Sequence, residues 1–267
     1  MRAYLSYFKL KFISGLQYRQ AAIAGISTQF FFGFVYIMIY VAFYQSGGKN
    51  LPMELPQLIT YVWLNQAFFA LIAQFYKDSE LFTLIRTGNI SYEFARPKSI
   101  YFLWYFKILG QRLANVLLRF VPLFVVTLLL PKPYNFGMPY SPIAFLIFVI
   151  TMIIGTLLIT ALSVLYPIIT LVTLNEKGIT NILIVVADLL SGVGIPIVFF
   201  PPLLLKISSL LPFQYISDLP FRIYVGNIPV SACLKPIIIQ FVWLILLMLI
   251  GQLLIKIIIK RVEVQGG

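Results

Sequence analysis

Histidine is absent from this chain of 267 residues, and charged residues make up only 10% of it. Without histidine there is no imidazole for general acid–base catalysis, for metal ligation or for a Ser–His or Cys–His pair. The single cysteine, Cys233, excludes an intrachain disulfide. The chain also lacks a Gly-x-x-x-x-Gly-Lys-Ser/Thr loop, which cradles nucleotide phosphates. We therefore expect no enzyme activity and no bound metal or cofactor, and any ATP hydrolysis would need another polypeptide.

Apolar residues are abundant instead, at 61% of the chain. A soluble domain is about 25% charged, and several apolar runs here reach about 20 residues, the length that crosses a bilayer as a helix. The sequence thus predicts an all-α membrane protein that forms one transmembrane domain over residues 1–267. The net charge of +12 does not indicate nucleic acid, because Lys and Arg accumulate beside membrane spans.

Six transmembrane helices are predicted, preceded by an interfacial helix over residues 1–20. The expected spans are 21–44, 57–76, 113–130, 142–174, a fifth from about residue 180, and 236–259. The fifth is broken, because Gly192, Gly194 and Pro196 interrupt its apolar sequence. The segment 201–235 is too apolar for a plain loop, so we expect short helices in the outer leaflet or a re-entrant segment there.

Most Lys and Arg residues fall in segments that this topology places on the side of the N-terminus. The positive-inside rule therefore predicts that both termini are cytoplasmic. The first residues, MRAYLSYFKLKF, mix charges with aromatic residues and lack the features of a cleavable signal peptide. We expect a multi-pass protein of a bacterial-type plasma (inner) membrane, in contact with membrane lipid.

The longest charged interval is residues 77–112, which we expect to be a cytoplasmic loop between the second and third spans. Within it, Asp78 or Ser79 can cap a short amphipathic helix that Gly88 ends. The helix would carry Glu80 in its first turn, Leu81, Leu84 and Ile85 on one face, and Arg86 near its end, with Arg96 and Pro97 closing the segment. So short a helix needs a partner for its apolar face, either the lipid surface or a groove on another protein.

Two stretches resemble a known family. LIRTGNISYEFARP (84–97), between the second and third spans, and SGVGIPIVFFPPLL (191–204) with the following LPF are similar to segments of ABC-2 type ABC transporter permeases, in particular the uncharacterised or viologen-exporter-like branch. The resemblance implies a dimer with a second permease subunit, identical or paralogous, and two copies of a cytoplasmic ATP-binding subunit that holds ATP and Mg. It also implies a coupling helix that docks this ATPase through Glu80, Leu81, Leu84, Ile85, Arg86, Gly88, Arg96 and Pro97.

Polar residues within the spans are candidates for a substrate path or a dimer seam. Asp188 is the one acid deep in a predicted span, where a charge costs roughly 2.5–3.5 kcal/mol on insertion scales. It either faces the path or the seam, or it lies nearer to water at the cytoplasmic end of its span. Asn65 and Gln66 either join helices or contact a ligand. The other predicted residues of the substrate path or dimer seam are Phe69, Gly192 and Gly194.

Three functions remain open on the sequence. The first is half of the translocation path of an ATP-driven exporter for an amphipathic or lipophilic compound, such as a drug, lipid or peptide. The second is an accessory membrane subunit without its own path. The third is a proton-coupled carrier that uses Asp188. An intramembrane aspartyl enzyme is disfavoured, because Asp188 has no second carboxylate beside it in the membrane sequence.

Overall fold

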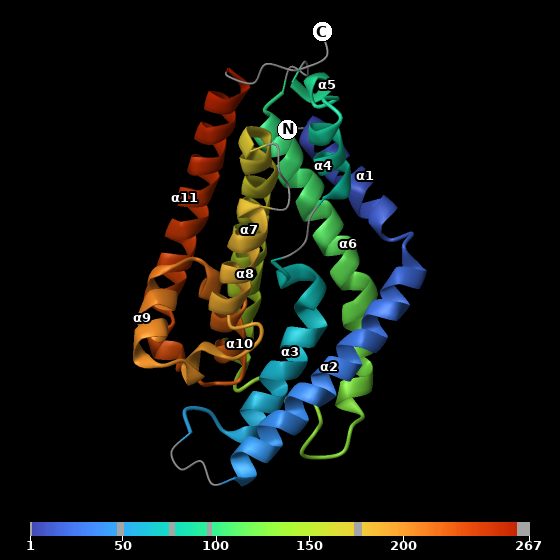
Figure 1. The fold of residues 1–267 in the computed structure, drawn as a ribbon. Helices are drawn as coiled ribbons and strands as arrows, with labels where there is room; N and C mark the ends of the chain where they lie inside the picture. The colour runs from blue at the N-terminus through green and yellow to red at the C-terminus, as the bar shows by residue number, and fades with distance from the viewer. Residues whose placement is uncertain (1, 47–50, 75–77, 95–97, 174–177, 261–267) are drawn as a thin grey trace.

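The computed structural model describes residues 2–46, 51–74, 78–94, 98–173 and 178–260. These residues form helices and connecting turns without a strand, which confirms the all-α prediction (Figure 1). Five helices are long and apolar enough to cross a membrane: α2 (Arg19–Gln45), α3 (Leu55–Ile72), α6 (Ile100–Leu128), α7 (Pro142–Thr173) and α11 (Leu234–Ile259).

The predicted count of six spans is not confirmed, because the fifth is a short helix. Helix α8 (Ile179–Leu190) has 12 residues and is thus about 18 Å long, well below the roughly 30 Å of a bilayer core. The chain then turns at Gly192, whose φ of 81° favours a residue without a Cβ, and Pro196 follows outside any α-helix. The interruption foreseen from Gly192, Gly194 and Pro196 ends the helix instead of bending it.

The third span begins earlier than expected, so the loop predicted over 77–112 is too long. Only α4 (Ser79–Arg86) and α5 (Ser91–Phe94) precede Ile100, where α6 starts. Lys107 and Arg112 made this stretch look like a loop, yet both side chains are buried, at 1% and 0% exposed. Their charges are compensated inside the bundle, which is why the helix can continue through them.

Helix α1 (Arg2–Gly15) lies along α6 near the end of the bundle that carries both termini (Figure 1). Two glycines permit this close approach. A Cβ on Gly15 would lie 2.7 Å from Cβ of Ala114, and a Cβ on Gly110 would lie 2.7 Å from the backbone oxygen of Phe8. Helix α1 begins and ends within the predicted interfacial segment 1–20, and one of its faces packs on protein.

The segment between α8 and α11 folds back into the bundle. It contains η1 (Ile197–Phe199), α9 (Pro202–Leu210), η2 (Phe213–Tyr215), α10 (Asp218–Tyr224) and η3 (Val230–Ala232). Gly155, in the middle of α7, lets the backbone of Ile216 approach, since a Cβ there would lie 2.5 Å from the Ile216 oxygen. The buried Gln240 Nε2 of α11 donates to the backbone oxygens of Thr151 and Tyr215 at 2.8 and 2.7 Å. The part of this segment around η2 and α10 is therefore packed against span-length helices, whereas α9 is mostly exposed.

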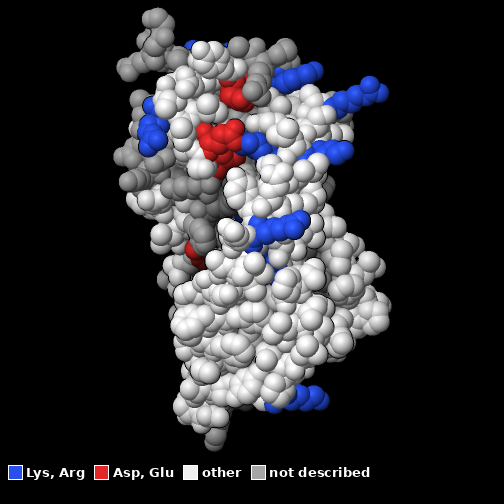
Figure 2. All heavy atoms as spheres, turned by 90° about the vertical axis from the view of Figure 1, so that its right-hand side faces the viewer, with Lys and Arg blue, Asp and Glu red and all other residues white. Residues whose placement is uncertain are grey.

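Charge is distributed unevenly along the molecule. In the face that Figure 2 shows, Lys, Arg, Asp and Glu gather in one half, whereas the other half is almost free of charge apart from basic side chains at its far end. Helices α4 and α5 lie at the end of the bundle that carries both termini (Figure 1). This arrangement suits a protein with one polar end and a wide apolar belt.

Candidate functional site

Helix α4 has the ends that the sequence predicts. Asp78 is the N-cap, and its Oδ1 accepts a hydrogen bond from the backbone N–H of Leu81 at 3.1 Å. Glu80 lies in the first turn and Arg86 in the last, where their charges oppose the helix dipole. Gly88 has a φ of 74°, as expected for the residue that ends such a helix.

Four charged side chains join α4 to α1 and α6, and we call them the charged clamp: Lys11, Asp78, Glu80 and Lys107. Lys107 Nζ lies 3.1 Å from Asp78 Oδ1 and 3.0 Å from Glu80 Oε2. Lys11 Nζ lies 2.6 Å from the same Glu80 oxygen. The side chains of Lys107 and Asp78 are 1% and 4% exposed, whereas that of Glu80 is 55% exposed. The Lys107–Asp78 ion pair of the clamp is therefore buried, whereas the ion pairs of Glu80 are partly solvated.

The pKa of Glu80 reflects both surroundings. Partial burial works to raise it, but the hydrogen bonds and charges of Lys11 and Lys107 outweigh that effect, so the pKa lies below its usual value. Glu80 therefore stays ionised at neutral pH and keeps both ion pairs.

The predicted docking residues do not share one surface. Leu81 and Ile85 are buried in the core of this chain, 1% and 6% exposed, and Leu84 is half-buried. Arg86 is exposed, and Gly88 is half-buried. Arg96 and Pro97 lie outside the described residues. The outward surface of α4 and α5 also contains residues that the sequence patterns did not indicate: Thr83, Thr87, Asn89 and Tyr92.

Arg112 fixes the end of α3 inside the bundle. Its Nη1 donates to the backbone oxygen of Leu71 at 2.6 Å, and its Nη2 donates to the oxygen of Ala73 at 3.1 Å and to Ser163 Oγ at 2.8 Å. Carbonyls at a helix C-terminus lack intrahelical partners and favour a cation. The sequence alone assigned Arg112 to a loop, so this role was missed.

A cleft of about 590 Å³ opens between α2, α3, α8 and the turn after α8. Its lining residues are Thr28, Gln29, Phe32, Tyr36, Gln66, Phe69, Asp188, Leu189, Val193, Gly194, Ile195 and Phe200. Four of them belong to the predicted path: Gln66, Phe69, Asp188 and Gly194. The cleft has the size and the mostly apolar walls of a small-molecule site.

Asn65 and Gly192, the other two predicted path residues, are not among the residues that line this cleft; they hold its wall. Asn65 Nδ2 donates to the backbone oxygen of Val193 at 2.8 Å. The backbone oxygen of Gly192 accepts a hydrogen bond from the Tyr61 hydroxyl at 2.9 Å. Both bonds run from α3 to the turn after α8. They position this turn through its backbone.

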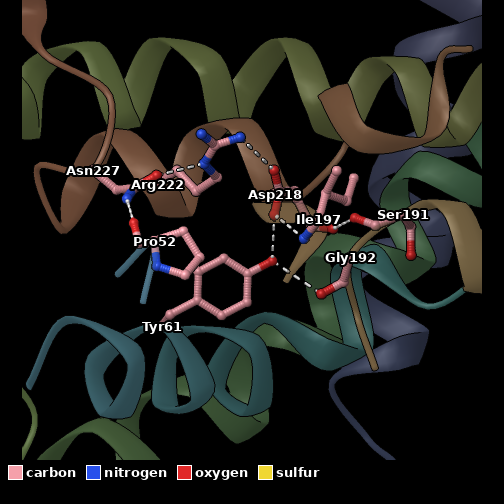
Figure 3. Close-up of polar contacts among 9 residues, drawn as sticks. Pro52, Tyr61, Ser191, Gly192, Ile197, Asp218, Arg222 and Asn227 are labelled. Carbon is pink, nitrogen blue, oxygen red and sulfur yellow. Dashed lines mark hydrogen bonds and ion pairs between the residues drawn. The ribbon is translucent and has the colours of Figure 1, made fainter. Parts of the chain in front are cut away.

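The Tyr61 hydroxyl also bonds to the buried carboxylate of Asp218, and we call this set the Asp218 network (Figure 3). Asp218 Oδ1 lies 2.9 Å from the Tyr61 hydroxyl, whose single proton is shared between this oxygen and that of Gly192, and it accepts from the backbone N–H of Ile197 at 3.2 Å. Arg222 Nη1 lies 3.4 Å from Asp218 Oδ2, and Arg222 Nε donates to Asn227 Oδ1 at 2.8 Å. The network thus joins α3, the turn after α8 and α10. Nothing in the sequence indicated it, because Asp218 lies in a segment expected outside the spans.

Two side chains in the cleft carry polar atoms without a partner. Gln29 is 2% exposed, and neither its Oε1 nor its Nε2 has a hydrogen-bond partner among the described residues. Asp188 forms a hydrogen bond with the backbone of Gln74, yet its Oδ1 is buried and unpartnered within the described chain. The described ion pairs do not include Asp188. Gln29 was not predicted from the sequence, although a lone amide in an apolar helix could have indicated it.

The described residues contain no group of three or more His, Cys, Asp or Glu side chains that could hold a metal ion. The described residues of the cleft offer hydrogen-bonding groups, the carboxylate of Asp188 and aromatic surfaces.

Comparison with known proteins shows the family of the chain. The family model for ABC-2 family transporter proteins matches residues 26–266. This range includes the cleft, the Asp218 network and every residue of the charged clamp other than Lys11. The match does not separate the viologen-exporter-like branch from the rest of the family. No curated protein and no solved structure matches the chain.

Proposed function

Because the chain belongs to the ABC-2 family of transporter proteins, we propose that it is the transmembrane subunit of an ATP-driven exporter. A second permease subunit, identical or paralogous, would complete the translocation path. Two copies of a separate ATP-binding subunit would bind ATP and Mg and hydrolyse the nucleotide. Both termini would lie in the cytoplasm of a cell with a bacterial-type plasma membrane.

The observation that carries this proposal is the charged clamp. A helix of eight residues does not persist alone in water, so α4 owes its position to its attachments. Leu81 and Ile85 anchor it in the core, and Lys107 and Lys11 tie its first turn to α6 and α1. A force applied to α4 would therefore reach a span-length helix directly. This is what a coupling helix requires.

The docking surface in this proposal is the outward side of α4 and α5. Leu84, Arg86 and Gly88 lie there, followed by Arg96 and Pro97 in sequence. Leu81, Ile85 and Glu80 then contribute to docking by holding the helix in place. The exposed Tyr92 adds an aromatic surface, which is common where proteins bind one another.

The cleft is the proposed part of the substrate path. Its aromatic and aliphatic walls suit an amphipathic or lipophilic compound, and the turn after α8 forms one side without regular hydrogen bonding. Irregular backbone at membrane depth is tolerated where it lines a cavity.

Co-purification tests the docking step. The chain would be expressed with the products of neighbouring reading frames, and the bound ATPase quantified for wild type, Arg86→Glu and Lys206→Glu. Lys206 is an exposed basic residue of α9 and provides the matched charge reversal. We expect Arg86→Glu to lose at least nine-tenths of the ATPase and Lys206→Glu to retain it. Equal retention by both variants would reject docking through α4.

Transport in reconstituted vesicles separates the alternatives. The exporter requires the ATPase and continues in the presence of an ionophore. A proton-coupled carrier would continue without the ATPase and stop with the ionophore. An accessory subunit would tolerate substitutions throughout the cleft.

A further inference from the structure

We infer that the cleft binds lipophilic primary or secondary amines in their protonated form, with the N–H groups directed at Asp188 and Gln29 and the apolar body against the aromatic wall. This inference rests on the proposed function and deepens it, because it names the class of compound that the path accepts. It depends on four features of the cleft, namely its charge, its acceptor atoms, its walls and its size.

The charge of the cleft has one sign. Among the described residues that line it, Asp188 is the only acidic one, and none is Lys or Arg. Asp188 forms no ion pair with a described residue, so its carboxylate lacks a counter-charge from this part of the chain. A charge at membrane depth is costly, and a cationic ligand would lower that cost by supplying a counter-charge to Asp188. An anionic ligand would instead be repelled.

The acceptor atoms distinguish an amine from a quaternary ammonium ion. Asp188 Oδ1 and Gln29 Oε1 are buried oxygens without a hydrogen-bond partner in the described chain. An unpartnered buried acceptor is unfavourable, and a charged N–H donor is the strongest partner for it. A quaternary nitrogen has no N–H and leaves both oxygens unpartnered. The cleft should therefore discriminate between two cations of equal charge and similar size.

The walls and the size define the rest of the ligand. Phe32, Phe69 and Phe200 offer apolar surface next to the polar side chains, and Tyr36 adds a further ring. An aromatic face also attracts a cation. A volume of about 590 Å³ suits a drug-sized molecule or a single alkyl chain, not a bulky polymer.

The test is equilibrium binding of dodecylamine and dodecyltrimethylammonium to the full chain in lipid nanodiscs at pH 7. The two probes share the tail and the charge and differ in N–H donors. We expect wild type to bind dodecylamine about tenfold more tightly. Asp188→Asn should weaken both probes, because it removes the charge that attracts each of them.

Variants of Gln29 isolate the hydrogen bond. Gln29→Leu should weaken the binding of dodecylamine several-fold and leave the binding of dodecyltrimethylammonium unchanged. Gln29→Glu should strengthen the binding of both probes. Gln45→Leu is the matched control, because Gln45 is exposed on the same helix and does not line the cleft. Thermal unfolding of each variant checks that the fold is retained, and the opposite signs expected for Leu and Glu exclude a general loss of structure.

Equal binding of the two probes to wild type, or equal losses for both probes with Gln29→Leu, would overturn the inference. So would a cleft that binds neither probe because a second copy of the chain covers it, which cross-linking across α2 would detect. These outcomes are independent of the ATPase co-purification, so the amine inference and the exporter proposal fail separately.

Discussion

Two regions of this protein attach a short helix to the bundle, and they differ in how far their charged groups are exposed to water. The charged clamp attaches α4 through two lysines and two carboxylates, one of which is 55% exposed. The Asp218 network attaches α10 through one carboxylate that is 1% exposed, a tyrosine hydroxyl and a backbone N–H. The partly exposed ion pairs of Glu80 can break and re-form at little cost, whereas the buried carboxylate of Asp218 depends on every one of its partners.

The difference assigns different tasks to the two regions. The charged clamp lies at the end that we propose faces the ATPase, where α4 must transmit a force and tolerate rearrangement. The Asp218 network holds the turn beside the cleft, where the backbone has no helix to stabilise it. The cleft is lined by this turn and by Asp188, whose Oδ1 is unpartnered among the described residues. Asp188, in the proposed path, thus differs from Asp78, Glu80 and Asp218, each of which has a basic partner among the described residues.

Removal of Asp218 should have the largest effect. Asp218→Leu leaves Arg222 without its carboxylate and the Ile197 N–H without its acceptor, and loss of one partner of a buried pair costs about 3–5 kcal/mol. We expect a large drop in the unfolding temperature in detergent. Tyr61→Phe, which removes one hydroxyl and keeps the carboxylate, should cost about 1–2 kcal/mol. Equal and small effects would show that the network does not stabilise α10.

Lys107→Met should have the second-largest effect on stability, because it removes the buried lysine of the charged clamp. Asp78 retains its bond to the Leu81 N–H and Glu80 is partly solvated, so we expect a loss of about 2–3 kcal/mol confined to α4. Hydrogen exchange of the α4 amides should accelerate while that of α7 stays unchanged. Lys256→Met, at an exposed position of α11, is the control. Faster exchange throughout the chain would contradict a local clamp.

Two glycines on the cleft side test the turn after α8. Gly192→Ala should cost about 1–2 kcal/mol, because its φ is 81° and a Cβ there would lie 2.9 Å from the Asp218 side chain. Gly194→Ala should be nearly neutral, since no atom lies within 4 Å of the place that its Cβ would occupy. The comparison requires only the two unfolding temperatures. A Gly194 effect as large as that of Gly192 would contradict the described turn.

Protonation of Glu80 at low pH should have the smallest effect on stability. Because its pKa is lowered in the folded chain, the stabilisation is fully present above the usual carboxylate value of about 4.3. It is lost as the pH falls through the lowered pKa. Hydrogen exchange of α4 should therefore accelerate in this acidic range, after correction for intrinsic rates. Glu80→Gln should abolish the pH step, and persistence of the step would assign it to another group.

Local signals explain which predictions succeeded. The cap at Asp78, the first-turn acid and Gly88 are short-range features, so α4 was placed from residues that are neighbours in sequence. Gln66, Asp188 and Gly194 were selected because polar or flexible residues are rare in apolar helices. Together with Phe69 they line one cleft, and their role in a substrate path stays a prediction. The predicted start of the third span, at residue 113, was wrong for the converse reason. Lys107 and Arg112 look like loop residues until the groups that neutralise them are known.

The sequence by itself determined the class of the protein, the approximate place of its long helices and the break near Gly192, because hydrophobic length and helix-breaking residues act locally. Tertiary structure decided which of the buried charges are compensated. Asp78 forms an ion pair with Lys107, and Asp218 forms a hydrogen bond with Tyr61 and an ion pair with Arg222. Asp188 forms no ion pair with a described residue. Such pairings join positions far apart in sequence, and the free energy of a buried charge depends on what surrounds it in space.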